Sequence, residues 1–163
     1  MSDNKFKMVD GLDQPVSDYL DIMQCLNQYC HVVDRGSVEQ IVAMFTDDAV
    51  LLTPYQNNDG FGGKFEGRAA IRTWYEDYDR DVRAGRRHRR HKISVPFITI
   101  DGETATSVCY LDSSTVLESA NTLQVSSGRY DDKLVKSDGT WLFQERVINI
   151  HHVHQVEAFD ELG

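Results

Sequence analysis

The hydrophobic pattern of this chain changes its period part-way along the sequence. Between about residues 17 and 45, and again between 68 and 83, apolar side chains recur every three or four residues, as in a helix with one buried face. After about residue 90, four long stretches carry the shorter repeats typical of strands. Helices therefore precede most of the sheet, and the order predicts an α+β fold with a mainly antiparallel sheet.

The boundaries of these elements can be placed from local signals. Helical periodicity defines three expected helices, at about residues 17–35, 38–45 and 68–83. Strand composition defines five expected strands, at about residues 49–53, 90–100, 104–116, 124–136 and 141–152. Ser17 is the expected N-cap of the first helix, and Ser37-Val38-Glu39-Gln40 has the pattern of a capping box. Asp101-Gly102 and Asp138-Gly139 are expected to form tight turns, and residues 54–67 a long glycine-rich loop or a loose hairpin.

Length and composition favour one domain. The chain has 163 residues, of which 40% are hydrophobic and 26% charged, enough apolar material for one core. We expect an N-terminal tail over 1–15, a single domain over 16–154 and a C-terminal tail over 155–163. The sequence contains neither an apolar run of membrane-spanning length nor an apolar N-terminal leader, so a cytoplasmic protein is expected. The three cysteines have no metal-ligand spacing and are expected to be buried thiols.

Charge argues against several classes of partner. The formal net charge is −9, which opposes binding to nucleic acid or to an anionic membrane. The basic stretch over residues 83–92 has no aromatic side chain that could stack on bases, and favours an ion-paired surface or a subunit contact. His151, His152 and His154 lack an acidic or thiol partner nearby, so we expect no metal and no cofactor.

Asp34 and His91 are the first candidate pair for chemistry. Asp34 lies at the end of the first expected helix and His91 at the start of the 90–100 strand. A carboxylate beside an imidazole fixes its tautomer and raises the basicity of the other ring nitrogen, which makes a general base. From the residues alone the bland alternative is favoured: Asp34 caps a turn and His91 belongs to a solvated basic stretch, since most such pairs in a sequence never touch.

A series of segments resembles the SnoaL-like branch of the nuclear transport factor 2-like superfamily. In chain order these are Ser17-Asp18-Tyr19-Leu20, Tyr29, Val33-Asp34-Arg35-Gly36, Phe45-Thr46-Asp47-Asp48-Ala49-Val50, His91, Asp101-Gly102, Thr104-Ala105-Thr106, Tyr130-Asp131-Asp132, and Asp138-Gly139-Thr140-Trp141 ending at Arg146. The resemblance spans about residues 16–153. It implies a cone-shaped fold in which a curved, mainly antiparallel sheet and three helices surround a pocket for a small apolar molecule.

The same resemblance implies roles for particular residues. Similar members are scytalone dehydratase, bile acid 7α-dehydratase and lindane dehydrochlorinase, which use an Asp–His pair in an elimination; Asp34 and His91 fall on that pair. Tyr29 falls on an active-site tyrosine of the bile acid enzyme, and Arg146 on the strand position of the dehydrochlorinase arginine. The second histidine of scytalone dehydratase would fall within residues 113–117, where this chain has none, so a scytalone substrate is not expected.

These observations together predict a function. We expect a cofactor-independent lyase of the dehydratase type that eliminates water from an apolar polycyclic or aromatic hydroxy-carbonyl molecule. Asp34, His91, Tyr29 and Arg146 are the expected catalytic residues. The expected substrate-binding residues are Tyr55, Phe61, Trp74 and Tyr130.

Several alternatives remain open. Tyr29 could be only a core aromatic, and Arg146 an outward arginine paired with a surface acid. A polyketide cyclase or a ketosteroid-type isomerase would use the same base. The third alternative is a noncatalytic ligand-binding protein or an oxygenase small-subunit-like module, which would have no use for that base. The resemblance also implies a homo-oligomer, either a dimer or a trimer.

Overall fold

The computed structural model describes residues 15–54 and 61–156. Its helices are α1 (Val16–Arg35), α2 (Val38–Val42) and α3 (Arg68–Tyr78), and α3 continues into the π-helical segment η1 (Asp79–Arg83). Its strands are β1 (Phe45–Thr53), β2 (Gly63–Glu66), β3 (Arg86–Ile93), β4 (Phe97–Asp101), β5 (Thr104–Leu117), β6 (Thr122–Ser137) and β7 (Thr140–Val156). The predicted α+β class, with three helices and a mainly antiparallel sheet, is confirmed.

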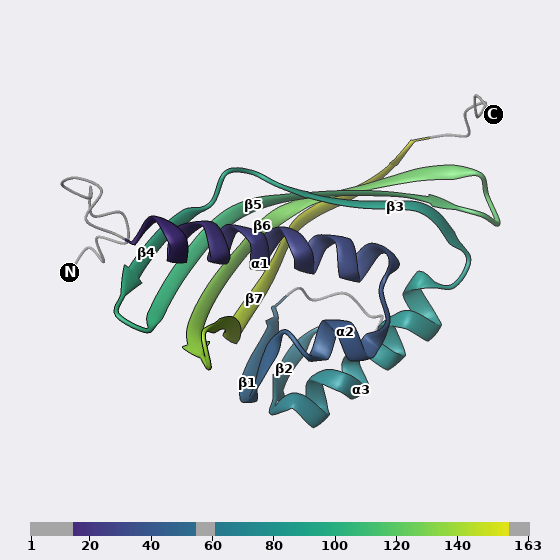
Figure 1. Cartoon of the computed structure of the whole chain (residues 1–163). Helices are drawn as coiled ribbons and strands as arrows, with labels where there is room; N and C mark the ends of the chain where they lie inside the picture. The colour runs from purple at the N-terminus through teal and green to yellow at the C-terminus, as the bar shows by residue number, and fades with distance from the viewer. Residues whose placement is uncertain (1–14, 55–60, 157–163) are drawn as a thin grey trace.

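All the described strands belong to one curved sheet. Its order is β2-β1-β7-β6-β5-β3, and β4 pairs with the part of β5 that β3 leaves free. The pairs are antiparallel except for β1 and β7, which run parallel. The helix α1 lies across one face of this sheet, and α2 and α3 pack with β1 and β2 at one end (Figure 1). The long strands β5, β6 and β7 therefore form a wall opposite the helices.

The first helix is held on the sheet by the apolar stripe that its sequence predicts. Its buried side chains include Ile22, Leu26 and Val33, which recur at helical steps and pack in the same core as residues of the sheet. The helix begins at Val16 with Pro15 in the N-cap position, so the cap predicted at Ser17 is wrong. The fixed φ of proline, −57° here, suits a helix start. The capping box at residues 37–40 is confirmed.

Three predicted boundaries differ from the structure. The strand expected over residues 90–100 is two strands, β3 and β4, because the chain leaves the ladder before Pro96, which has no N–H to donate. The second helix ends at Val42 rather than near Phe45, and Phe45 instead starts β1 beside β7. The last strand continues to Val156, four residues beyond its predicted end at residue 152.

A glycine allows the long strands β6 and β7 to approach each other closely at one point. The pairing register of β6 and β7 shifts between Ser127 and Gly128. A Cβ atom at Gly128 would lie 2.0 Å from the backbone oxygen of Asn149, so no larger residue fits without movement of the backbone. This irregularity lies in the strands that form the wall opposite α1.

Candidate active site

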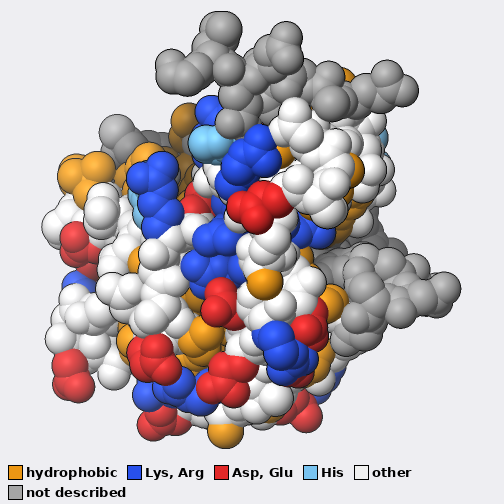
Figure 2. Space-filling model, turned by 90° about the vertical axis from the view of Figure 1, so that its right-hand side faces the viewer, with side chains coloured by type: hydrophobic (Ala, Val, Ile, Leu, Met, Phe, Trp, Pro, Cys, Tyr) orange, Lys and Arg blue, Asp and Glu red, His pale blue; other side chains and the backbone are white. Residues whose placement is uncertain are grey.

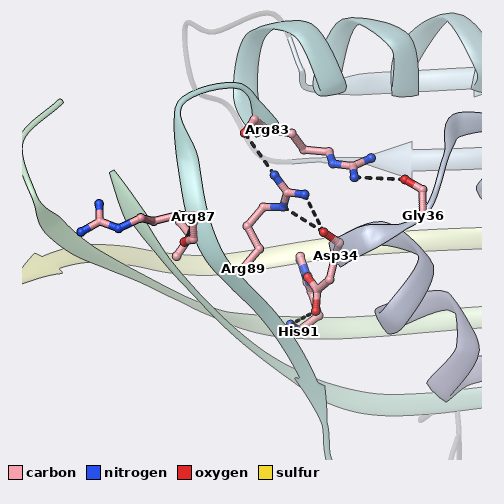
Figure 3. Close-up of polar contacts among 7 residues, drawn as sticks. Asp34, Gly36, Arg83, Arg87, Arg89 and His91 are labelled. Carbon is pink, nitrogen blue, oxygen red and sulfur yellow. Dashed lines mark hydrogen bonds and ion pairs between the residues drawn. The ribbon is translucent and has the colours of Figure 1, made fainter. Parts of the chain in front are cut away.

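The structure brings Asp34 and His91 into direct contact. The Nδ1 atom of His91 lies 2.6 Å from Oδ1 of Asp34, and the backbone N–H of His91 donates to Oδ2 at 2.9 Å. Both carboxylate oxygens therefore hold the same residue, one through its ring and one through its backbone. Figure 3 shows the ring and the carboxylate at the end of α1, beside the strand β3. This arrangement fixes the orientation of the imidazole.

Arginines of the basic stretch support the end of α1 that carries Asp34. Arg89 donates to the backbone oxygen of Asp34 through Nη2 at 2.5 Å and Nε at 3.2 Å, and to the backbone oxygen of Arg83 at 3.1 Å. Arg83 in turn donates to the backbone oxygen of Gly36 at 3.1 Å (Figure 3). These guanidinium groups satisfy carbonyls that a helix end leaves without partners. For Arg89, the predicted role in an ion-paired surface or a subunit contact is therefore wrong.

Arg83, at the start of the basic stretch, and Arg80 just before it do lie among acidic residues. Arg80 contacts Asp77 at 2.8 Å and Asp81 at 2.6 Å, and Arg83 contacts Asp79 at 2.9 Å. On the face seen in Figure 2, basic and acidic side chains lie intermixed rather than in a block of one sign. This part of the surface matches the ion-paired alternative that the sequence favoured.

The charge state of Asp34 determines which nitrogen of His91 is available. Burial tends to raise the pKa of the Asp34 carboxyl group. The hydrogen bonds and charge of His91, with the charge of Arg89, outweigh burial and hold that pKa below its usual value. The ionised carboxylate accepts the proton on Nδ1, which leaves Nε2 as the nitrogen that can take a proton from a ligand. No described residue hydrogen-bonds to Nε2, and His91 lines a cavity.

The cavity has a volume of about 200 Å³ and lies between the helices and the wall of long strands. Its lining residues come from α1, α3, η1, β3, β5, β6 and β7 and from the segment before β2. Aromatic and aliphatic side chains form most of it, and they include Val33, Phe61, Leu111, Ile148 and Ile150. A concave, mostly apolar site with few polar groups is the usual form of a small-molecule site.

Tyr29 shares a hydrogen bond with Tyr75 inside the cavity. The two hydroxyl oxygens lie 2.5 Å apart, and both residues line the cavity. Burial raises the pKa of Tyr29 to about 12, although the charge of Arg146 opposes the rise, and burial raises the pKa of Tyr75 well above its usual value. Both phenols are therefore neutral at pH 7. Because their mutual bond uses only one of the two protons, one O–H can donate to a ligand.

The structure places Arg146 behind the cavity wall rather than on it. Its side chain is fully buried, and Nε and Nη2 donate to Asp132 at 2.8 and 3.0 Å. The guanidinium carbon lies 3.8 Å from the ring centre of Tyr29 and 4.1 Å from that of Tyr130. The alternative of an outward arginine with a surface acid is thus wrong, because the arginine and its acidic partner are both buried. Arg146 acts on the cavity only through the aromatic rings that it supports.

Three of the four predicted substrate-binding residues line the cavity. These are Phe61, Trp74 and Tyr130. Trp74 packs edge-on against Phe61, with ring centres 6.0 Å apart, and its indole N–H donates to the backbone oxygen of Phe61 at 3.1 Å. The fourth, Tyr55, lies outside the described residues.

Several residues of the site were not predicted. Tyr75 is only one of the apolar positions in the helix predicted over residues 68–83, and the polar wall residues Ser113, Ser126 and Gln124 gave no signal. For Arg89, its position two residues before His91 in an extended segment is a usable signal. In β3 the side chains of Arg89, His91 and Ile93 are half-buried, whereas their neighbours are exposed. Alternating burial of this kind marks one face of a strand as inward.

The described residues provide neither a metal-binding cluster nor a membrane-spanning helix. Residues 15–54 and 61–156 contain no group of three or more His, Cys, Asp or Glu side chains that could hold a metal ion. His152 and His154 lie on one face with their rings stacked, 6.2 Å between centres. None of the described helices has both the length and the apolar character needed to cross a membrane.

The sequence matches a known family over most of its length. The model of the SnoaL-like domain aligns with residues 14–147. The chain belongs to the SnoaL-like domain family. Membership confirms the predicted resemblance, and the fold of this SnoaL-like protein is the nuclear transport factor 2-like one. Among curated proteins, none matches the sequence.

Solved structures share the fold of this SnoaL-like protein. A protein of Novosphingobium aromaticivorans assigned as a scytalone dehydratase has a TM-score of 0.72 and 20% identity, over 91% of this chain and 95% of that one. The hexachlorocyclohexane dehydrochlorinase LinA-type3 of Novosphingobium barchaimii has a TM-score of 0.71 and 13% identity, over 91% and 96%. ActVI-ORFA of Streptomyces coelicolor has a TM-score of 0.70 and 22% identity, over 86% and 99%. At these identities the likeness shows the fold.

Proposed function

We propose that this SnoaL-like protein is a cofactor-independent lyase that eliminates water from a small molecule bearing a hydroxyl group near a carbonyl. The observation that supports it is the contact of His91 Nδ1 with the Asp34 carboxylate, with Nε2 left without a described partner in a residue that lines the cavity. A general base needs this combination of a fixed tautomer and an accessible second nitrogen. The names of the dehydratase-like and dehydrochlorinase structures agree with elimination as the reaction class.

The proposed reaction assigns one step to each group. Nε2 of His91 removes the proton on the carbon next to the carbonyl, and the electrons of that C–H bond form an enolate. The free O–H of the Tyr29–Tyr75 pair donates to the enolate oxygen. As the double bond forms, the C–O bond of the hydroxyl group breaks, and the imidazolium returns its proton to the departing oxygen. The products are a conjugated enone and water.

In this proposal Asp34 and Arg146 have supporting roles. Asp34 holds the ring of His91 and balances the positive charge that His91 acquires. Arg146 keeps the rings of Tyr29 and Tyr130 in place from behind, so it is a positioning residue.

The test is turnover on a panel of hydroxy-ketosteroids and aromatic hydroxyketones, followed by the absorbance of the new conjugated enone. We expect His91→Ala and Asp34→Asn to lower turnover by about 10²- to 10⁴-fold, which is the usual contribution of a general base. The matched control is His31→Ala, because His31 is an exposed histidine on α1, and it is expected to leave turnover unchanged.

Two outcomes would contradict the proposal. Turnover that survives both substitutions in folded protein would exclude the dyad as the base. Tight binding of panel compounds without turnover would instead favour a ligand-binding protein. Circular dichroism spectra of all variants would separate loss of chemistry from loss of fold.

A further inference from the structure

The cavity wall contains an arginine that no described residue neutralises. Arg86 lines the cavity, and neither a hydrogen bond nor an ion pair joins its side chain to any part of the chain that the structure describes. Its neighbours in the basic stretch differ. Arg89 is bonded to backbone oxygens, and Arg87 donates to Asn121 at 2.6 Å. Figure 3 shows Arg87 pointing away from the Asp34–His91 pair.

An irregularity in β3 places Arg86 on the same side of the sheet as His91. Five positions separate the two residues, and in a regular strand an odd separation puts side chains on opposite faces. Between Arg87 and Arg90, however, the register with β5 shifts, so that one extra residue of β3 is inserted. His88 lies there with a φ of 54°. The extra residue puts the side chains of Arg86 and His91 back on the same face of β3, and both residues line the cavity.

The charge of the described cavity lining is opposite in sign to that of the molecule. The whole chain has a formal net charge of −9, but the described lining contains Arg86, Arg89 and His91 and no Asp or Glu. Burial raises the pKa of Tyr78, which lines the same end, and the positive charges of Arg86 and Arg89 oppose that rise. An anionic group that entered this end would meet only positive or neutral side chains among the described residues.

Polar side chains connect Arg86 to the dyad along the sheet wall. His91 pairs with Ser113, which pairs with Ser126, and the next inward pair is Thr115 with Gln124. All four line the cavity, and the side chains of Ser113, Ser126 and Gln124 make no hydrogen bond to a described residue. The opposite wall is aromatic, with Tyr29 and Trp74 among its residues. The cavity therefore has one wall for an apolar ring system and one for polar substituents.

We propose that Arg86 binds a carboxylate of the substrate. The substrate is then an amphipathic acid whose ring system lies on the aromatic wall, with its carboxylate at the Arg86 end. Five residues at about 3.3 Å each put the Cα atoms of Arg86 and His91 at most roughly 16 Å apart. This separation limits the distance, within the substrate, between the carboxylate and the carbon that loses its proton. The identity of that carbon rests on the proposed function, whereas the anion site does not.

The test compares a charged probe with its neutral analogue in binding alone. The probe is 4-(2-naphthyl)butanoate, and the analogue is its methyl ester; affinities are measured by isothermal titration calorimetry. We expect the wild-type protein to bind the acid more tightly than the ester. Arg86→Gln should lower the affinity for the acid about ten- to a hundredfold, as for loss of a charge-assisted hydrogen bond, and leave the affinity for the ester unchanged. Arg86→Lys is expected to retain part of the preference.

The matched control is Arg90→Gln, because Arg90 is an exposed arginine of the same strand and carries the same charge. Equal affinity of wild type for acid and ester, no measurable binding of either, or equal weakening of the acid by Arg86→Gln and Arg90→Gln would overturn the proposal. The preference for the acid is also expected to persist in His91→Ala. Failure of the elimination mechanism is therefore distinguishable, since it would abolish the effect of His91 on turnover but leave the acid preference unchanged.

Discussion

Arg146 and Asp132 form a charge pair without exposed surface. Burial tends to lower the pKa of Arg146, but the Asp132 carboxylate and the surrounding tyrosines hold that pKa above its usual range, so the guanidinium is charged. Its Nη1 atom has no hydrogen-bond partner among the described residues. Removal of either partner would leave a buried charge uncompensated, which is far costlier than the loss of an exposed ion pair.

We therefore expect Arg146→Met and Asp132→Asn each to lower the free energy of unfolding by about 3–5 kcal/mol. The double variant should lose less than the sum of the two, because it leaves no unpaired charge. Urea unfolding of the four proteins measures this coupling. Additive effects would mean that the two side chains contribute independently.

The three cysteines are expected to be unreactive in the folded protein. Burial raises the pKa of Cys25 and Cys109 to about 12 and that of Cys30 to about 11. Since the thiolate is the reactive form, about one Cys25 side chain in ten thousand is ionised at pH 8. A chromogenic disulfide reagent at pH 8 should label none of them before unfolding and all three in urea. Rapid labelling of native protein would contradict the burial.

The same shifts give a pH dependence of stability. The unfolded cysteines lose their protons near pH 8.5, whereas the folded ones retain them until pH 11 or 12. The unfolded state thus binds fewer protons over this interval, and the free energy of unfolding falls as pH rises through it. Their contribution is fully retained below about pH 8.

At the residue scale, the predicted site came mainly from the resemblance to the SnoaL-like branch. Asp34 and His91 were predicted as a pair, and the structure brings them together. Tyr75 and Arg86 were missed because their roles depend on distant partners or on backbone irregularity. The hydroxyl partner of Tyr75 is 46 residues away in the sequence. The side of the sheet on which Arg86 lies depends on a β-bulge that the residue types of β3 do not reveal.

Among the elements, β6 depends most on a single residue type at one position. An alanine Cβ at Gly128 would overlap a backbone oxygen of β7, and backbone cannot rotate away as a side chain can. We expect Gly128→Ala to cost about 1–3 kcal/mol of unfolding free energy, the range of overpacked substitutions. Thermal unfolding should show a lower midpoint, and Ser126→Ala on the same strand is the control, because its side chain makes no hydrogen bond to a described residue. Equal midpoints would mean that the strands separate there without cost.

Element types were predictable where the periodicity was long, and boundaries failed where tertiary pairing decided them. Phe45 continues the apolar pattern of the second helix, yet it lies in β1. Its backbone oxygen accepts from Arg68 at 2.6 and 3.1 Å, and it pairs with Phe143 of β7. Neither contact can be inferred from the local residue types, so the helix was predicted several residues too long.

For the whole molecule, we propose a homo-oligomer, as the sequence resemblance predicts. The side chains of Val95 and Tyr110 are 80% and 68% exposed, and the adjacent Phe97 is 37% exposed. Tyr110 lies between the inward residues Cys109 and Leu111, so it projects from the face opposite α1. Exposed apolar side chains gathered on one face are typical of an interaction surface.

We expect light scattering after size exclusion to give the mass of a dimer or a trimer for wild type. Tyr110→Lys should shift it toward 18.6 kDa, the mass of one chain, because a buried unpaired charge would disfavour association. Thr106→Lys, an exposed position on the same strand, is the control for added charge. A wild-type mass of one chain would show that this surface is not a contact between copies.

The parallel pairing of β1 with β7 has a kinetic consequence. These strands are far apart in the sequence, and every other ladder among the described strands joins strands that are nearer along the chain. Pairings of such separation form slowly, because a long loop must close before any contact compensates for the lost chain entropy. The cavity includes residues from both α1 and β7, so it does not exist until these distant parts of the chain have met. We therefore expect ligand binding only after this long-range step of folding.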